Sequence, residues 1–205
     1  MSDKPYDGRH GSDDALHDLV AGTSPVTGQA FFPALVEHLA AALNVRMAVV
    51  TECLDDQFHH VRQLARWKDG SLDGGLEYDT DNTPCSKVLL SGGTCYYPDH
   101  VQEHFPGNTF LPAFGAITYL GIPLIDAEGT TLGHLYVVDS KPLANPEQAK
   151  AILSIFASRA AIELLRQRTM EALRTTTSEL RFVNDLIEQT TQPVAVTELN
   201  GTLVR

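Results

Sequence analysis

Residues 116–139, which read AITYLGIPLIDAEGTTLGHLYVVD, predict a β-hairpin. Two apolar runs, 117–125 and 132–138, flank a polar turn that ends in Gly129. β-Branched and aromatic residues bounded by turn residues are typical of paired strands. Neither run alternates between apolar and polar residues, which indicates that both faces of the hairpin are covered by other parts of the protein. We therefore expect this hairpin at the centre of a sheet.

The composition excludes two classes of partner. The formal net charge of −11 argues against binding to nucleic acid or to anionic lipid, both of which need clustered Lys and Arg. No apolar run reaches the roughly 20 residues of a membrane-spanning helix, and the N-terminus has no apolar signal-peptide core. The three cysteines, Cys53, Cys85 and Cys95, form no even disulfide framework, which suits a reducing compartment. We expect a cytoplasmic protein without nucleic-acid or membrane partners.

Hydrophobic periodicity and turn residues predict the elements around the hairpin. A helix is expected at 31–44, where apolar residues recur on one helical stripe. Pro84 suits the first position of a helix ending near Leu90, with Thr83 as its N-cap. Strands are expected at 45–53, 59–69, 76–78 and 94–99, and one or two short helices within 100–115. Strands in mixed order, with a helix before and after them, indicate an α+β fold.

Residues 147–192 contain neither Gly nor Pro and predict one long helix or two nearly continuous ones. Its first half has a broad apolar face made of Ile152, Ile155, Phe156, Ile162 and Leu165. Its second half narrows to a seam with nearly seven-residue spacing, made of Leu173, Thr176, Leu180, Val183 and Ile187. The last segment, QPVAVTELNGTLVR, predicts a strand, an Asn-Gly turn and the start of another strand. Such a hairpin buries nothing by itself, so we expect the chain to belong to a longer protein.

Two segments carry a family resemblance: YDTDNTPCSKVLLSGGTCYYPDHVQEHFP, residues 78–106, and ITYLGIPLIDAEGTTLGHLYVVDSKPL, residues 117–143. They resemble a GAF domain, the small-molecule-sensing module of bacterial signalling proteins and cyclic-nucleotide phosphodiesterases. The resemblance covers about residues 23–168 and implies a central antiparallel sheet of five or six strands with flanking helices. One face would carry the terminal helices and a dimer contact, and the other a ligand pocket roofed by residues 84–114.

The C-terminal part shows a second resemblance. The segment ELRFVNDLIEQTTQPVAVTELNGTLVR, residues 179–205, is similar to the beginning of a PAS domain. Together the resemblances divide the chain into an N-terminal tail at 1–22, a GAF-like sensor at 23–168, a signalling helix at 169–190 and a truncated PAS-like start at 191–205. Signalling helices join such modules in homodimeric receptors. A homodimer through the terminal helices and an output domain in the same chain are therefore implied.

Aromatic residues crowd the segment that would roof the pocket. Side chains with an apolar body and a polar tip suit a pocket around a small planar or apolar ligand, and they suit a filled core equally well. We predict that the ligand-binding residues are Tyr78, Cys85, Tyr97, Phe105, Phe114, Tyr119 and His134. For His134, a hydrogen-bonded core histidine is the alternative.

The cofactor and the ligand are not identified by sequence. Tetrapyrrole-binding GAF domains attach their pigment through a Cys, usually beside a His, and none of the three cysteines here has a neighbouring His. The dispersed Asn-Lys-Phe-Asp-Glu set of the cyclic-nucleotide-binding members is not found either. His100, Glu103 and His104 fit the H-x-x-E-H pattern of zinc peptidases, but Pro98 and Pro106 leave a helix of about two turns and no third ligand is evident. We expect a solvated helical turn there and no metal site, with a noncatalytic metal or haem contact through His100, His104 or His134 as the alternative.

Cys85 and Cys95 leave a redox alternative open. Cys85 falls in the first turn of a helix, where the helix dipole favours a thiolate. The two cysteines and the loop PDHVQEHFPGN also resemble the free methionine sulfoxide reductases. That family needs a further cysteine after the Phe-Pro-Gly turn, and NTFLPAFGAITYLG has none. A reversible Cys85–Cys95 switch and two ordinary half-buried cysteines both remain.

These features predict a noncatalytic sensor of an unidentified small molecule, with the hairpin as the floor of its pocket and residues 78–114 as the roof. The output in such architectures is most often a histidine kinase. A cyclic-dinucleotide enzyme or a transcriptional activator would also fit, and thiol chemistry at Cys85 and Cys95 is the enzymatic alternative. A third hypothesis is a dimerisation module whose pocket is a filled core.

Overall fold

The computed structural model describes residues 27–190, 196–197 and 203–204. The chain divides into two compact units, Met1–Leu165 and Arg166–Arg205. The expected N-terminal tail and most of the expected PAS-like start lie outside the described residues. Within the described part, no helix is both long and apolar enough to cross a membrane.

The first unit is built on one antiparallel sheet, which confirms the expected α+β class. Its strands are β1 (Met47–Cys53), β2 (His60–Lys68), β3 (Ser71–Asp73), β4 (Glu77–Asp79), β5 (Cys95–Tyr97), β6 (Thr118–Ile125) and β7 (Thr131–Asp139). Their order is β3-β2-β1-β7-β6-β5, and β4 also pairs with β2. The sheet is thus slightly larger than expected, because β3 forms in a segment that carries no strand signal in the sequence.

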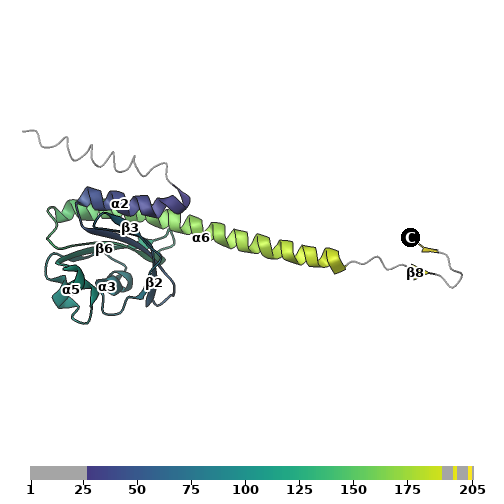
Figure 1. Cartoon of the computed structure of the whole chain (residues 1–205), viewed down its shortest axis with the longest axis horizontal. Coiled ribbons are helices and arrows are strands. Elements are labelled where there is room, and N and C mark those ends of the chain that lie inside the picture. The colour runs from purple at the N-terminus through teal and green to yellow at the C-terminus, as the bar shows by residue number, and fades with distance from the viewer. Residues whose placement is uncertain (1–26, 191–195, 198–202, 205) are drawn as a thin grey trace, which may run out of the picture. The chain divides into compact units, whose positions relative to one another are not determined.

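The helices lie on both faces of this sheet. They are η1 (Gly28–Ala30), α2 (Phe31–Leu43), α3 (Pro84–Ser91), α4 (Val101–His104), α5 (Phe110–Phe114) and α6 (Pro146–Thr190). Figure 1 shows α2 and the first part of α6 on one face, with α3 and α5 on the other. The N-cap of α3 is confirmed, because the Thr83 hydroxyl accepts the backbone N–H of Ser86.

The hairpin predicted at 116–139 is confirmed, and it lies in the middle of the sheet. β6 pairs with β7 across a turn in which Gly129 has a φ of 87° and the Asp126 carboxylate accepts backbone N–H groups. β7 pairs with β1 on its other side. Every residue of β7 after Thr131 is buried, which explains why apolar and polar residues do not alternate along it.

An aliphatic core lies between one face of the sheet, α2 and the first part of α6. The buried apolar residues of α6 recur at helical spacing and are Ala149, Ile152, Leu153, Phe156, Ala157, Ala160, Ala161 and Leu164. The prediction for Ile162 is wrong, since its side chain is 71% exposed, and Leu165 is 40% exposed. The sequence predicted a face of large side chains, whereas four of these eight buried residues are alanines.

The second unit contains the rest of α6 and a short strand pair. The prediction of one long helix is confirmed, and its side chains from Thr169 to Leu186 are exposed. β8 (Val196–Thr197) pairs in antiparallel fashion with β9 (Leu203–Val204). The Asn-Gly turn expected between them lies outside the described residues.

A β-bulge in β2 changes which side chains share a face of the sheet. Val50 of β1 pairs with Ala65, and the next residue, Thr51, pairs with Gln63, so Leu64 is the extra residue. In a regular strand, two residues three positions apart point to opposite faces. The bulge instead puts Gln63 and Arg66 on the same face, the one that α3 covers.

Candidate functional site

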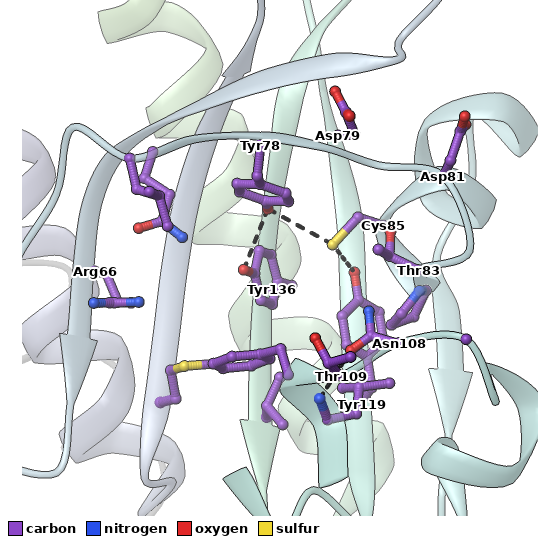
Figure 2. Close-up of a pocket in the computed structure, with 18 residues that line it drawn as sticks. Arg66, Tyr78, Asp79, Asp81, Thr83, Cys85, Asn108, Thr109, Tyr119 and Tyr136 are labelled. Atoms are coloured by element: carbon purple, nitrogen blue, oxygen red, sulfur yellow. Dashed lines mark hydrogen bonds between the residues drawn. The ribbon is translucent and has the colours of Figure 1, made fainter. Parts of the chain in front are cut away.

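A cavity of about 340 Å³ lies on the sheet face that α3 covers. β1, β2, β6 and β7 supply its floor, with side chains that include Met47, Gln63, Tyr119 and Tyr136. Residues around β4, the beginning of α3 and the segment 107–111, which includes the first two residues of α5, supply its other walls (Figure 2). The cavity is at the lower end of the volumes typical of small-molecule sites, about 300–1,000 Å³. It has the hairpin below and part of the segment 78–114 above, as expected for the ligand pocket.

Three phenols, two from the floor of the cavity and one from β4, cluster around the thiol of Cys85 (Figure 2). Tyr119 Oη donates a hydrogen bond to Cys85 Sγ at 3.7 Å. Tyr78 Oη lies 3.8 Å from the same sulfur and 3.3 Å from Tyr136 Oη. A Cβ at Gly121 would lie 2.5 Å from Tyr119 Oη, so the glycine leaves room for this phenol. The cluster therefore combines flat aromatic faces with hydroxyl groups, which suits a planar ligand.

The cluster is uncharged at neutral pH. Burial raises the pKa of the Cys85 thiol, although hydrogen bonds from Tyr119 and Tyr78 act in the opposite direction. Burial also raises the pKa of the Tyr78, Tyr119 and Tyr136 phenols, and the neighbouring Cys85 adds to each shift. The protonated thiol is a poor nucleophile. The expected thiolate at the beginning of α3 is thus opposed by desolvation, which the sequence does not reveal.

Gln63 and Arg66 form a polar side of the cavity. Gln63 is 5% exposed, and its Oε1 atom has no hydrogen-bond partner among the described residues. A buried acceptor without a partner costs about 1–3 kcal/mol. Arg66 is bound by the Asp73 carboxylate through Nε at 2.7 Å and Nη2 at 2.6 Å. The guanidinium is therefore held in place and neutralised, while the Gln63 Oε1 acceptor is left without a partner among the described residues.

His134 lies in the same row of the sheet as Gln63, because both pair with Thr51 of β1. Its Nδ1 atom is 2.6 Å from Thr51 Oγ1, and its ring stacks on Tyr136 at 5.0 Å between centroids. The ring is fully buried, and burial lowers its pKa to about 3. His134 is therefore a neutral residue of the layer beside the cavity and is not among the residues that line it.

The neutral state of His134 makes stability depend on pH. Its pKa is 6.5 when the chain is unfolded and about 3 when folded, so the unfolded state binds an additional proton between these values. The stabilisation is complete above pH 6.5 and is lost as the pH falls toward 3. Between pH 7.5 and pH 5 we expect wild type to lose about 2 kcal/mol relative to His134→Gln, whose side chain does not titrate. Urea unfolding of both proteins measures this difference, and a difference that stays constant with pH would contradict the assignment.

The structure brings together three of the seven residues predicted to bind ligand. Tyr78, Cys85 and Tyr119 line the cavity. The other four do not: His134 lies in the layer beside it, and Tyr97, Phe105 and Phe114 belong to the surrounding aromatic core. Tyr97 meets Phe105 edge to face at 5.4 Å, and the Arg46 guanidinium covers the Phe114 ring at 4.5 Å.

Cys95 packs against the same aromatic core as Cys85 but does not line the cavity. It is a half-buried free thiol on β5, and its sulfur lies 3.8 Å from Ser91 Oγ. Cys85 is also free, so the structure contains the two reduced thiols that the redox alternative requires and no bond between them. A reversible disulfide between Cys85 and Cys95 stays a prediction.

Sequence reasoning missed Gln63, Arg66 and Tyr136. Tyr136 could have been found from the two-residue period of β7, because it shares its face with His134 and Val138. Gln63 and Arg66 could not be grouped in this way, since the bulge at Leu64 breaks the period.

The residues of the H-x-x-E-H motif lie in different surroundings. α4 is a single turn, and His100 precedes it with a left-handed φ of 50°. Glu103 lies 3.3 Å from His100 Nδ1, while the His104 ring packs on Tyr97. Across the described residues, no group of three or more His, Cys, Asp or Glu side chains is arranged to hold a metal ion.

Comparison with known proteins gives the family. The GAF domain profile matches residues 27–164. A search of the curated proteins found no match. Among solved structures, the GAF domain of an Acinetobacter phosphoenolpyruvate-protein phosphotransferase is similar, with a TM-score of 0.63 at 15% identity over 84% of this chain and 99% of that one. The corresponding GAF domain from Coxiella burnetii has a TM-score of 0.61 at 18% identity, over 78% of this chain and 96% of that one.

A chromophore-binding domain is also similar. That of Stigmatella aurantiaca phytochrome P1 has a TM-score of 0.59 at 12% identity, and the match covers 78% of this chain and 62% of that one. At these identities the likeness shows the fold alone. The family profile, the antiparallel sheet and the cavity over its hairpin agree with one another, and GAF domains are regulatory and sensory modules. The chain belongs to the GAF domain family.

Proposed function

We propose that this chain is a noncatalytic sensor module that binds a small molecule in the cavity beside Cys85. The observation that carries the proposal is the cavity itself, which has flat phenols and a buried acceptor without a partner. A filled core, as in the dimerisation hypothesis, would leave no such space. The redox alternative has less support, because burial disfavours the Cys85 thiolate.

We propose that α6 transmits the ligand-bound or ligand-free state of the cavity to the domain that follows. Its second half exposes Leu173, Leu180 and Val183, at 58%, 66% and 51%, with the spacing of a coiled-coil seam. A second copy of the helix would cover these side chains, so the working form is a homodimer. A ligand can shift the state of such a dimer only by the difference between its affinities for the two states.

The protein in which this module works is proposed to be a cytoplasmic signalling protein. A PAS-like domain would follow the signalling helix, and an output domain in the same chain would read the state of the dimer. A histidine kinase is the favoured output, with a cyclic-dinucleotide enzyme or a transcriptional activator as alternatives. The resemblance of the C-terminal segment to the beginning of a PAS domain supports this arrangement.

Native mass spectrometry tests both parts of the proposal. We expect a dimer that carries a small-molecule mass, and this mass should disappear when the protein is denatured. Added back at 100 times its dissociation constant, the released molecule should stabilise the protein by about 2.7 kcal/mol. Leu180→Glu should give a monomer, whereas Leu54→Glu, at a site 43% exposed in the first unit, should leave the dimer intact. A wild-type monomer would contradict the helix proposal, and a protein that no small molecule stabilises would contradict the sensor.

A further inference from the structure

The bulge places two polar residues, Gln63 and Arg66, beside each other on the cavity. They differ in the hydrogen-bonding groups that each leaves free for a ligand. Gln63 is held by its backbone, whose N–H donates to Leu76 O and whose carbonyl accepts from Gly75 N–H, both at 2.8 Å. Its side chain is buried, it lines the cavity, and its Oε1 atom has no partner among the described residues. The atom has almost no accessible surface, so a ligand that satisfies it must turn the Gln63 amide toward the cavity and bring a hydrogen-bond donor.

Arg66 constrains the charge of the ligand. Its guanidinium lines the cavity beside Gln63, but Nε and Nη2 are both occupied by the Asp73 carboxylate. The charge-assisted pair is bidentate, which is the strongest geometry for Arg and a carboxylate. The positive charge is therefore already compensated by the protein, and the site gains little from an anionic ligand.

The carboxylates at the edge of the cavity do not select a cation either. Asp79 and Asp81 are 72% and 68% exposed, so water screens them. Each also contacts a histidine, with Asp79 3.0 Å from His60 and Asp81 3.1 Å from His59. The buried interior of the cavity is thus balanced in charge and favours a neutral molecule.

The third constraint is shape. Tyr136 stacks on Tyr119, with 5.4 Å between the ring centroids and 25° between the ring planes, and Tyr78 lies beside them (Figure 2). These phenols form one aromatic surface of the cavity. Flat rings and a volume of about 340 Å³ suit a ligand of one or two fused rings.

We propose that the cavity recognises a neutral aromatic molecule that carries a hydroxyl or N–H donor, and that this donor is bound by Gln63 Oε1. This inference rests on the proposed sensor function and names the chemical class of its ligand. Gln63 is the specificity-determining residue, and Arg66 keeps the Gln63 side of the cavity polar without demanding a charged ligand.

Three probes of the same two-ring shape test the class by isothermal titration calorimetry at pH 7. They are 2-naphthol, which is a neutral donor, 2-methoxynaphthalene, which has no donor, and 2-naphthoate, which is an anion. On the wild-type protein we expect 2-naphthol to bind about tenfold more tightly than 2-methoxynaphthalene, since one buried hydrogen bond separates them. We expect 2-naphthoate to bind more weakly than 2-naphthol.

A substitution locates the effect at Gln63. Gln63→Leu should weaken 2-naphthol binding about tenfold and leave 2-methoxynaphthalene binding unchanged. Gln57→Leu, at an exposed turn residue, is the matched control and should change neither. The comparison of the three probes on wild type needs no variant, so it stands even if Gln63→Leu fails to fold.

The other outcomes overturn the inference in distinguishable ways. Equal binding of 2-naphthol and 2-methoxynaphthalene would show selection by shape without a donor site, and the sensor function would stand. Tightest binding of 2-naphthoate would show that Arg66 recognises an anion. Binding of none of the probes would refute the ligand class, while the mass carried by the purified protein would still judge the sensor function by itself.

Discussion

Replacing Gly133 with alanine is expected to lower the free energy of unfolding by about 3 kcal/mol, which corresponds to about 6–12 °C in melting temperature. Gly133 is on β7 and pairs with Glu52 of β1 and with Leu124 of β6. A Cβ at this position would lie 2.0 Å from the backbone oxygen of Thr51 and 2.8 Å from the Cα of Glu52. Because both contacts are with backbone, no side-chain rotation relieves them, and β1 and β7 must separate. Urea unfolding of the two proteins measures the effect.

Gly93→Ala is the matched control for this substitution. The nearest atom to a Cβ at Gly93 is Ser91 Oγ at 3.8 Å, which is ordinary van der Waals contact, and the backbone there is not left-handed. We expect its free energy of unfolding to stay within about 0.5 kcal/mol of wild type. If the two substitutions cost the same, the close approach of β1 to β7 is not a requirement of the fold.

Leu153→Ala is expected to have the second large effect, a loss of about 3 kcal/mol. Leu153 is fully buried on α6 in the aliphatic core, where it is surrounded by side chains of the sheet and α2. Truncation removes its buried methyl groups and leaves a cavity that the rigid sheet cannot close. The same change at Leu90 of α3, whose side chain is 69% exposed, should cost less than about 0.5 kcal/mol. Chemical unfolding of both variants compares the free energy of unfolding lost at a buried leucine with that lost at an exposed one. Equal losses would mean that α6 does not pack on the sheet through this face.

The elements that short stretches of sequence specify were predicted correctly. The hairpin follows from two uninterrupted apolar runs and a turn that ends in Gly129, and the beginning of α3 follows from Thr83 and Pro84. The length of α6 follows from the absence of Gly and Pro over 147–192. Each of these features depends on neighbours in the chain, so each is visible in the sequence.

The face by which α6 packs was predicted only in part. Ile152 and Phe156 are buried as expected, but Ile162 is exposed. Hydrophobicity ranks Ile above Ala, whereas close packing of a helix on a sheet favours small side chains such as Ala157 and Ala160. This preference depends on the surface that the helix meets, which the sequence of the helix does not contain.

The candidate site was also predicted only in part, because part of it depends on how two strands pair. Tyr78, Cys85 and Tyr119 were predicted because the family resemblance places their segments around a pocket. Gln63 and Arg66 were missed because one inserted residue, Leu64, moves Gln63 to the other face of β2. A bulge depends on the register between two strands, and a single strand does not reveal it.

The sheet separates two cores that differ in composition and in role. The aliphatic core on the helix side contains none of the residues that line the cavity, and it gives the first unit much of its stability. The residues around the cavity belong to the other face, where aromatic, polar and sulfur-containing side chains meet. Side chains that line the cavity can therefore be exchanged without altering any contact within the aliphatic core. A different set of these side chains would change which molecule fits, on the same sheet and helices.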